Sequence, residues 1–383
     1  MARGPRISFY IDALEFPALT VIGVSYQGML RRRRPVIAFL SLALCLTLSL
    51  LAWIIVEEEP LWELPDFQDP IPSNLSSPPS LRRSATLYDT NFSFVLDLAE
   101  YNRSYPALQN YRCRAVIGLQ GYCRTQEPLI LMAVKSHASA RYRRDALRRT
   151  WAKERRIGGF TFKPVFLMAN SGKKRQMMRL IEEASFFGDI LMWDFFESHH
   201  NLSLKERCFL EWLYYRCHEA KYIFKGDDDE FVNPYALAAY VSSSDPAHRL
   251  KIHGQLQIHP PPERWGKYAV PHSVYPHGHY PPFVSGGGFL LPAELVPSLH
   301  WAASIIPVFP LDDVFIGFLA LATKVSFHHD PRFFSFGLKN DDICHYLDVL
   351  VAHGLSARRM LEVWEVLPYL KPCPPQITEE PQI

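Results

Sequence analysis

Residues 222–230 read Tyr-Ile-Phe-Lys-Gly-Asp-Asp-Asp-Glu, and this stretch decides the fold. Its apolar start is typical of a short buried strand, and Asp227, Asp228 and Asp229 follow that strand at once. In open α/β sheets, ligands bind outside the carboxyl ends of the strands. Three adjacent carboxylates repel one another, and oxygen ligands suit Mg²⁺ or Mn²⁺ shared with diphosphate oxygens. The stretch therefore favours a metal site over its alternative, a solvated acidic turn.

The chain on both sides of this stretch alternates between apolar runs and helical patterns. The apolar runs predict strands at residues 129–134, 165–168, 189–193 and 222–224. Helical patterns fall between them at residues 143–153, 171–187 and 204–219. Because strands alternate with helices, we expect an α/β domain with a mainly parallel sheet. This domain is expected to cover residues 127–373, with a loose tail at residues 374–383.

An apolar run near the start of the chain predicts a transmembrane helix. Residues 35–56 contain no charged side chain, and a helix of this length crosses a bilayer core of about 30 Å. Four arginines precede the run and three glutamates follow it, so the positive-inside rule leaves residues 1–34 in the cytosol. A cleaved signal peptide is the alternative, but the run is long and lacks a small-residue cleavage site. We expect a single-pass type II protein that starts at Met1 or at Met29.

Residues 57–126 predict a luminal stem. They are rich in Pro, Ser and Asn and show no sustained period, which is typical of a spacer between a membrane and a domain. Four N-glycosylation triplets, all on the expected luminal side, agree with this topology and imply surface positions. Their asparagines are Asn74, Asn91, Asn102 and Asn201.

The cysteines also indicate the secretory pathway. Six of the seven lie on the expected luminal side, where an oxidising compartment favours disulfides. Their pairing is open, except that Cys208 and Cys217 are not expected to bond with each other. On one helix they would lie about 13 Å apart, which is beyond the roughly 7 Å that a disulfide can bridge.

Three further motifs carry candidate chemistry. Asp312 and Asp313 precede an apolar helical pattern, where one carboxylate can cap the helix while the other faces a site. Residues 280–289 contain three glycines, which either let the backbone approach a ligand closely or form a tight loop. His328 and His329 follow later. A neutral imidazole can complete a Mn²⁺ shell, although a lone histidine is more often structural.

These motifs, in this order, resemble the β1,3-glycosyltransferase family, which includes β1,3-galactosyltransferases and β1,3-N-acetylglucosaminyltransferases. The resemblance covers residues 113–373 in five ordered blocks: LILMAVKS, GDILMWDFFESHHNLSLKE, YIFKGDDDEFVNP, YPPFVSGGGFLL and FPLDDVFIG. Three details favour the N-acetylglucosaminyltransferase branch: the stretch GDILMWDF, the SGGGFLL form of the glycine block, and the closing helix near residues 360–364. Ala152 and Glu230 depart from the family, which has Gly and a small apolar residue there. HHDPRFF fits its histidine block only loosely.

The resemblance implies a GT-A-like fold with a single nucleotide-binding domain. It also implies an inverting transfer from a UDP-α-sugar to a β1,3 linkage, with Asp313 as the catalytic base. Mn²⁺, which would neutralise the leaving diphosphate, would be held by Asp227, Asp229 and His329. Donor contacts are expected from Asp228, Arg144, Arg148 and Asp194. The acceptor side is expected to be shaped by Gly286, Gly287 and Gly288.

The expected reaction moves N-acetylglucosamine from UDP-N-acetylglucosamine to the 3-position of a terminal β-galactose on a glycoprotein or glycolipid, inside the Golgi. A β1,3-galactosyltransferase would use the same residues with UDP-galactose. A non-catalytic Golgi binding protein would not need intact carboxylates in both acidic blocks, and a sugar hydrolase would not need the metal triplet. The net charge of +2 gives no support for a nucleic-acid partner.

Overall fold

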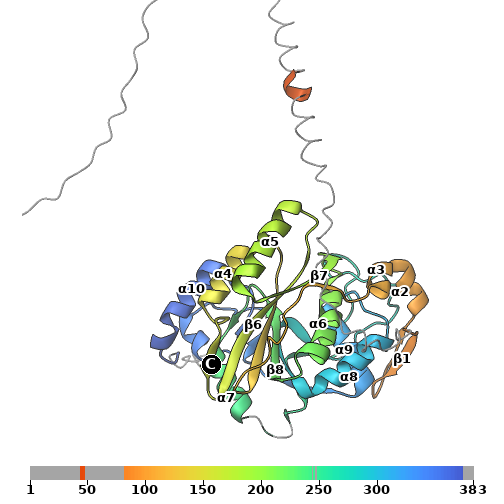
Figure 1. Ribbon diagram of the computed structural model, residues 1–383. Coiled ribbons are helices and arrows are strands. Elements are labelled where there is room, and N and C mark those ends of the chain that lie inside the picture. Colours follow the sequence, from red (N-terminus) through yellow and green to blue (C-terminus); the bar gives the residue numbers. More distant parts are fainter. Residues whose placement is uncertain (1–43, 48–81, 244, 246–247, 374–383) are drawn as a thin grey trace, which may run out of the picture. The chain divides into compact units, whose positions relative to one another are not determined.

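The structure is a computed structural model that describes residues 44–47, 82–243, 245 and 248–373 (Figure 1). The chain divides into two units, residues 1–60 and residues 61–383. In the first unit the described part is one helical turn at residues 44–47. None of the described helices is long and apolar enough to cross a membrane. Most of the predicted span at residues 35–56 and the whole tail at residues 374–383 lie outside the described residues, so both stay predictions.

The second unit is built on a mixed sheet of nine strands, in the order β12-β10-β11-β8-β4-β6-β7-β3, with β5 paired to β6. The strands are β3 (Ala115–Ile117), β4 (Leu129–Lys135), β5 (Arg155–Ile157), β6 (Phe160–Asn170), β7 (Ile190–Phe196), β8 (Ala220–Asp227), β10 (Lys251–Gln257), β11 (Phe283–Pro292) and β12 (Ser326–His329). The central strands β8, β4, β6 and β7 run parallel. By contrast, β11 lies antiparallel to both β8 and β10, and β3 lies antiparallel to β7.

The prediction of a mainly parallel sheet is therefore right for the centre, whereas the flanks are mixed: β12 pairs parallel with β10, but β11, β3 and β5 pair antiparallel with their neighbours. Parallel neighbours need a long crossover, whereas a strand that returns through a loop can pair antiparallel. Between β10 and β11 the chain returns through residues 258–282, which contain no helix or strand. The chain thus passes from β10 to the antiparallel strand β11 without a crossover helix.

Helices cover both faces of the sheet (Figure 1). One face carries α4 (Arg141–Arg149), α5 (Lys174–Phe187), α7 (Pro234–Ser243) and α10 (Ala357–Val366). The other face carries α6 (Leu202–Arg216), α8 (Val296–Ile305) and α9 (Asp312–Thr323). Strand β4 shows why two cores form, because alternate side chains of a strand point to opposite faces. Leu131 lies in the core under α6, and its neighbour Met132 lies in the core under α4.

Residues 82–126 belong to the folded unit, although the sequence placed them in the stem. They include β1 (Ala85–Tyr88), β2 (Ser93–Leu96), α2 (Leu98–Ser104) and α3 (Pro106–Asn110). Buried apolar side chains that join the core under α6, α8 and α9 are Phe94, Leu96, Tyr101 and Leu108. The amide of Gln109 donates to Val308 O at 2.8 Å and its oxygen accepts from Val308 N at 2.9 Å. The packed unit thus begins by residue 82. Elements this short give no sustained period in the sequence.

Three disulfides stabilise this arrangement: Cys113–Cys208, Cys123–Cys217 and Cys344–Cys373. The first two join the 82–126 segment to α6 and to the residue that ends it. Cys208 and Cys217 therefore have different partners, which confirms the expectation drawn from their spacing on one helix.

A small second sheet lies beside the main one, in the order β13-β14-β9. Its strands are β13 (Phe333–Phe334), β14 (Val351–Ala352) and β9 (Phe231–Val232). β14 pairs antiparallel with β9, and Leu355 N donates to Asp229 O at 2.7 Å. The chain after β14 is thereby held against the acidic turn that precedes β9.

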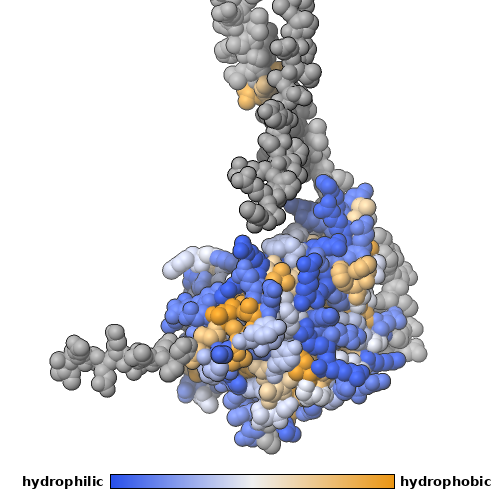
Figure 2. All heavy atoms as spheres, turned by 90° about the vertical axis from the view of Figure 1, so that its left-hand side faces the viewer, coloured by the Kyte–Doolittle hydropathy of each residue, from blue (hydrophilic) through white to orange (hydrophobic). Residues whose placement is uncertain are grey.

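The side of the molecule formed by α4, α7 and α10 is largely hydrophilic, with smaller hydrophobic patches (Figure 2). Here the Arg155 guanidinium lies over the Trp364 ring, 4.6 Å from its centroid. This cation–π contact helps to hold the C-terminal helix α10 on this side of the sheet.

The described residues also include three short 3-10 helices, Ala293–Leu295, Ile343–Leu347 and Leu367–Tyr369.

A truncation test distinguishes between a domain that starts at residue 127, as the sequence predicted, and a packed unit that begins by residue 82, as the structure shows. A chain that begins at Glu127 should fail to unfold cooperatively, because it loses four buried apolar side chains and leaves Cys208 and Cys217 unpaired. Each large apolar side chain contributes about 1.5–3 kcal/mol when buried, so the loss is comparable with a whole domain stability of about 5–15 kcal/mol. A chain that begins just before residue 82 is the control. Equal melting curves for the two would contradict the assignment.

Candidate active site

One buried lysine joins three elements at the carboxyl edge of the sheet. Lys135 ends β4 and is the register partner of Asp227, which ends the parallel strand β8. Its Nζ lies 3.3 Å from Asp227 Oδ1 and 2.6 Å from Asp312 Oδ2 at the start of α9. Burial alone would lower the pKa of Lys135, but the two carboxylates raise it, so the ammonium stays charged. Burial would likewise raise the pKa of Asp312, and Lys135 holds it below its ordinary value.

The next two aspartates are held by an arginine on α4. Arg143 Nη1 lies 3.2 Å from Asp228 Oδ1 and 3.1 Å from Asp229 Oδ2. Ser136 Oγ donates to Asp228 Oδ2 at 2.6 Å. Burial raises the pKa of Asp228 despite the opposing effects of Ser136 and Arg143. Both oxygens of Asp228 are thus bound by neighbouring side chains, whereas the Asp229 carboxylate is partly exposed.

A histidine that the sequence analysis did not select completes this cluster. His353 follows β14, and its Nε2 lies 3.4 Å from Asp229 Oδ1. The ligand atoms of Asp227, Glu230 and His353 all lie within 4.8 Å of one another. Carboxylate oxygens with one neutral imidazole are a fitting donor set for Mn²⁺. The described residues therefore contain a candidate cation site at the end of β8.

The predicted ligand His329 lies elsewhere. It sits on β12, and its Nδ1 accepts a hydrogen bond from Leu256 N at 3.2 Å. Strands β10 and β11 separate β12 from β8, and three strand spacings amount to about 14 Å. The structure therefore does not bring His329 to the aspartates, so its role as a ligand stays a prediction, and His353 is the histidine beside them.

Asp313, the predicted base, is not one of the three residues of the candidate cation site. Its Oδ1 accepts from Val314 N at 2.8 Å and its Oδ2 accepts from Gly286 N at 3.3 Å. Burial and the neighbouring Asp312 carboxylate raise the pKa of Asp313 to about 7. The side chain is only partly buried, so a substrate can reach it. The two adjacent aspartates thus have pKa values shifted in opposite directions, which is the pattern of acid–base sites.

Comparisons with known proteins agree with this geometry. A family model described as galactosyltransferase matches residues 142–331. The human N-acetyllactosaminide β1,3-N-acetylglucosaminyltransferase 3 is 36% identical over 359 residues, which cover 88% of this chain and 95% of the relative. The rat UDP-GlcNAc:betaGal β1,3-N-acetylglucosaminyltransferase 7 is 30% identical over 375 residues, covering 85% of this chain and 94% of the relative. The chain belongs to the β1,3-glycosyltransferase family.

This β1,3-glycosyltransferase is a UDP-sugar-dependent enzyme of the β1,3-N-acetylglucosaminyltransferase branch. A third relative, the human UDP-GlcNAc:betaGal β1,3-N-acetylglucosaminyltransferase 9, is 33% identical over 296 residues, covering 70% of this chain and 72% of the relative. The mixed α/β sheet agrees with the expected GT-A-like fold.

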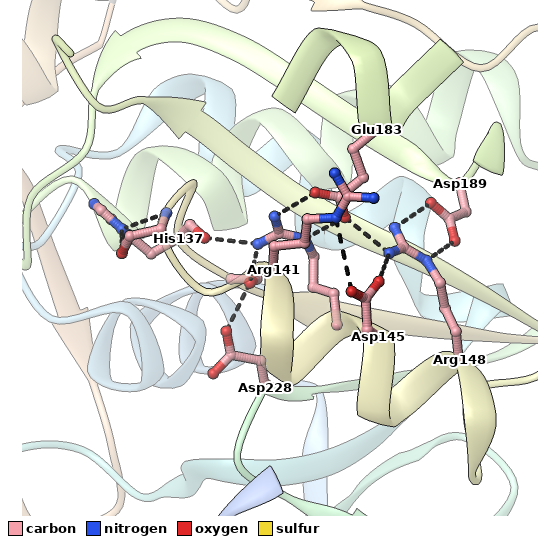
Figure 3. Close-up of polar contacts among 10 residues, drawn as sticks. His137, Arg141, Asp145, Arg148, Glu183, Asp189 and Asp228 are labelled. Atoms are coloured by element: carbon pink, nitrogen blue, oxygen red, sulfur yellow. Dashed lines mark hydrogen bonds and ion pairs between the residues drawn. The ribbon is translucent and has the colours of Figure 1, made fainter. Parts of the chain in front are cut away.

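Two of the predicted donor-binding residues of this glycosyltransferase are engaged in the scaffold. Arg144 is completely buried and makes a bidentate pair with Glu183, at 2.8 and 2.7 Å. Arg148 makes a bidentate pair with Asp189 and also contacts Glu183 (Figure 3). Both guanidinium groups are occupied by carboxylates, so neither is placed to contact a donor. Arg143, one residue earlier, is the arginine of α4 that faces the acidic turn.

Another predicted donor-binding residue, Asp194, lies at the carboxyl end of β7 and is partly buried. It accepts a hydrogen bond from the Tyr111 hydroxyl, and Arg114 lies 3.8 Å away. β7 is separated from β8 by β6 and β4, so Asp194 belongs to the same edge of the sheet as the acidic turn but not to the cluster itself. Its donor role stays a prediction.

Two of the three glycines of β11, Gly287 and Gly288, are required by close neighbours. A Cβ on Gly287 would lie 2.5 Å from Ser335 O, and one on Gly288, which has φ +99°, would lie 2.4 Å from Val351 Cγ1. Gly286 presents its N–H to Asp313. Gly286 thus orients the predicted base, and Gly288 lies beside Glu230 of the candidate cation site. Its predicted contact with the acceptor stays a prediction.

The glycosylation sites can be placed in part. Asn91 is exposed, and Asn102 and Asn201 are partly exposed, so all three positions are on the surface. The Asn201 amide donates to Phe196 O at 2.7 Å. Asn74 lies outside the described residues.

Sequence reasoning missed Lys135 and Arg143, and a signal existed for the first. A lone cation at the end of the apolar run 129–134 is expected beside the end of β8, because parallel strands bring their carboxyl ends to one edge. No signal of this kind marks His353, which is brought to the site by the short strand pair β9 and β14.

The two adjacent aspartates should respond differently to removal of their charge. Asp313→Asn should lower turnover by roughly 10²–10⁴-fold, because it removes the base, and should leave UDP affinity nearly unchanged. Its melting temperature should be equal or higher, since repulsion with Asp312 is relieved. Asp312→Asn leaves Lys135 with one partner fewer and should cost stability, by about 3–5 kcal/mol. Kinetics, UDP titration and urea unfolding of both variants measure these differences.

The pH dependence follows from the same assignment. Asp313 is protonated below its pKa and can accept a proton only above it, so kcat/KM should rise with pH through about 7. An acidic limb near the ordinary carboxyl range of about 4, or near-normal turnover of Asp313→Asn, would contradict the role of Asp313.

Proposed function

We propose that this enzyme moves N-acetylglucosamine from UDP-N-acetylglucosamine to the 3-position of a terminal β-galactose, with Mn²⁺ as its cofactor. The observation that carries the proposal is that one glycine strand, β11, lies against two acidic sites. Glu230, which clusters with Asp227 and His353, lies beside Gly288, and Asp313 lies beside Gly286. One site suits a cation and a diphosphate, and the other suits proton transfer.

The proposed reaction is one in-line displacement. An acceptor hydroxyl beside Asp313 gives its proton to the carboxylate as its oxygen bonds to the anomeric carbon of the donor sugar. The bond between that carbon and the diphosphate oxygen breaks, and UDP leaves with the electron pair. Because the oxygen enters from the face opposite UDP, the α-linked donor gives a β-linked product. Val314 N and Gly286 N hold the Asp313 carboxylate while this happens.

The cation is proposed to lie between Asp229 and His353, next to Asp227. Two observations support this site: Asp227, Glu230 and His353 offer carboxylates with one imidazole, and the buried Glu230 oxygens lack a partner among the described residues. When bound, the ion would supply positive charge to the departing diphosphate. Arg143 holds Asp229 beside His353, and Lys135 fixes Asp227.

The donor and acceptor are inferred from relatives. Two of them carry names that specify UDP-GlcNAc and a β-linked galactose, at 30% and 33% identity. The runner-up is transfer of galactose from UDP-galactose, which is supported by the description of the matching family model. The same base and the same cation site would serve either donor.

A donor screen tests this assignment. The purified enzyme, given Mn²⁺ and a galactose-terminated acceptor, should transfer N-acetylglucosamine and form a β1,3 linkage, seen by mass spectrometry and NMR. A chelator should abolish the transfer, and added Mn²⁺ should restore it. Transfer from UDP-galactose alone would favour the runner-up. Full activity in excess chelator would refute the metal dependence.

We also propose that the enzyme is a single-pass type II protein of the Golgi membrane, with its folded domain in the lumen. The apolar run at residues 35–56, the arginines before it and the glycosylation triplets after it support this topology. Three disulfides fit an oxidising lumen.

Topology is tested on the full-length chain in cells. An endoglycosidase that removes N-glycans should lower the apparent mass, and the folded domain should resist added protease until the membrane is permeabilised. A cytosolic C-terminus, or a mass that does not change, would refute the luminal assignment.

A further inference from the structure

Glu230 is a buried carboxylate without a hydrogen-bond partner. It follows the three aspartates directly, and its side chain is fully buried. Neither of its carboxylate oxygens has a partner among the described residues. The nearby Trp151 indole donates to the Glu230 backbone oxygen instead, at 2.8 Å. Buried polar atoms are almost always paired, so each exception calls for an explanation.

The surrounding backbone makes room for this carboxylate. A Cβ added to Gly226 would lie 1.9 Å from Glu230 Oε2, and one added to Gly288 would lie 3.1 Å from it. Gly226 lies on β8 and Gly288 on β11, so two strands of the main sheet leave the space that the side chain fills. The buried Glu230 side chain therefore fills a space that exists only because both strands carry glycine there.

The unpaired carboxylate points to the place where Asp227 and His353 meet. The ligand atoms of the three residues lie within 4.8 Å of one another. Opposite ligands of an octahedral ion with bonds of about 2.1 Å lie about 4.2 Å apart, so small shifts of the side chains would bring all three to one ion. Glu230 also departs from the small apolar residue that the family resemblance leads us to expect at this position.

We propose that Glu230 is a direct ligand of the divalent cation, together with Asp227 and His353. The inference rests on the metal dependence proposed above and adds an anionic oxygen ligand to that site. A bound cation supplies the partner that both Glu230 oxygens lack. A further carboxylate raises the negative charge of the ligand set, so this chain should bind Mn²⁺ more tightly than the same site without Glu230.

The test measures Mn²⁺ binding by the full-length chain in detergent, without donor or acceptor. Binding is measured by calorimetry and by the shift in melting temperature. Glu230→Gln keeps the shape of the side chain and removes its charge. It should weaken Mn²⁺ binding by at least about tenfold and reduce the rise in melting temperature that Mn²⁺ produces. Without metal, it should melt at or above the wild-type temperature, because an unpaired buried carboxyl has been removed. Glu230→Ala is a second variant with the same expected loss of Mn²⁺ affinity.

Two histidine variants serve as controls. His353→Ala should lose Mn²⁺ affinity. His329→Ala makes the same change on strand β12, away from the site, and should keep it. If the wild-type chain binds Mn²⁺ and Glu230→Gln binds it equally well, the role of Glu230 is refuted while the cation site stands. If the wild-type chain shows no binding of Mn²⁺, the metal dependence itself fails, and this inference fails with it.

Discussion

The contact between Lys135 and two aspartates is the interaction on which the site depends. Six carboxyl groups gather at one edge of the sheet, from Asp227 to Glu230 and at Asp312 and Asp313. Lys135 and Arg143 pair with four of them. Unpaired charges this close together would cost several kcal/mol each in a partly buried setting, so the strand end could not form without the lysine. Neither cation pairs with Glu230, whose buried oxygens lack a partner among the described residues, and this makes a divalent ion a fitting partner.

The same lysine explains why adjacent aspartates can perform different tasks. Asp312 is bound to Lys135 and is held ionised, which leaves Asp313 beside a fixed negative charge and raises its pKa to about 7. A base with a pKa near the working pH combines a useful fraction of the deprotonated form with real affinity for a proton. Gly286 N then holds this base, and β11 keeps glycine at the next two positions because a side chain at Gly287 or Gly288 would collide with Ser335 or Val351.

A feature of the fold or of the site could be predicted from the sequence where the contacts that determine it are between residues close together in the chain. The runs at residues 129–134 and 222–224 predicted β4 and β8, because buried parallel strands are continuously apolar. Asp227 and Asp313 could be identified from short local patterns. His353 and the packing of residues 82–126 could not, since they depend on a two-residue strand pair and on disulfides to α6. Arg144 and Arg148 were assigned to the donor because their long-range partners, Glu183 and Asp189, are invisible in the local pattern.

The central claim is that a divalent cation binds at the end of β8, next to His353 and apart from the base. Anomalous diffraction from crystals of the enzyme grown with Mn²⁺ and UDP tests it most directly. We expect one strong manganese peak at coordination distance, about 2.0–2.6 Å, from carboxylate oxygens of the acidic turn and from the His353 imidazole, with diphosphate oxygens completing its shell. A peak at His329, a peak beside Asp313, or no peak at a Mn²⁺ concentration that supports full activity would contradict the claim.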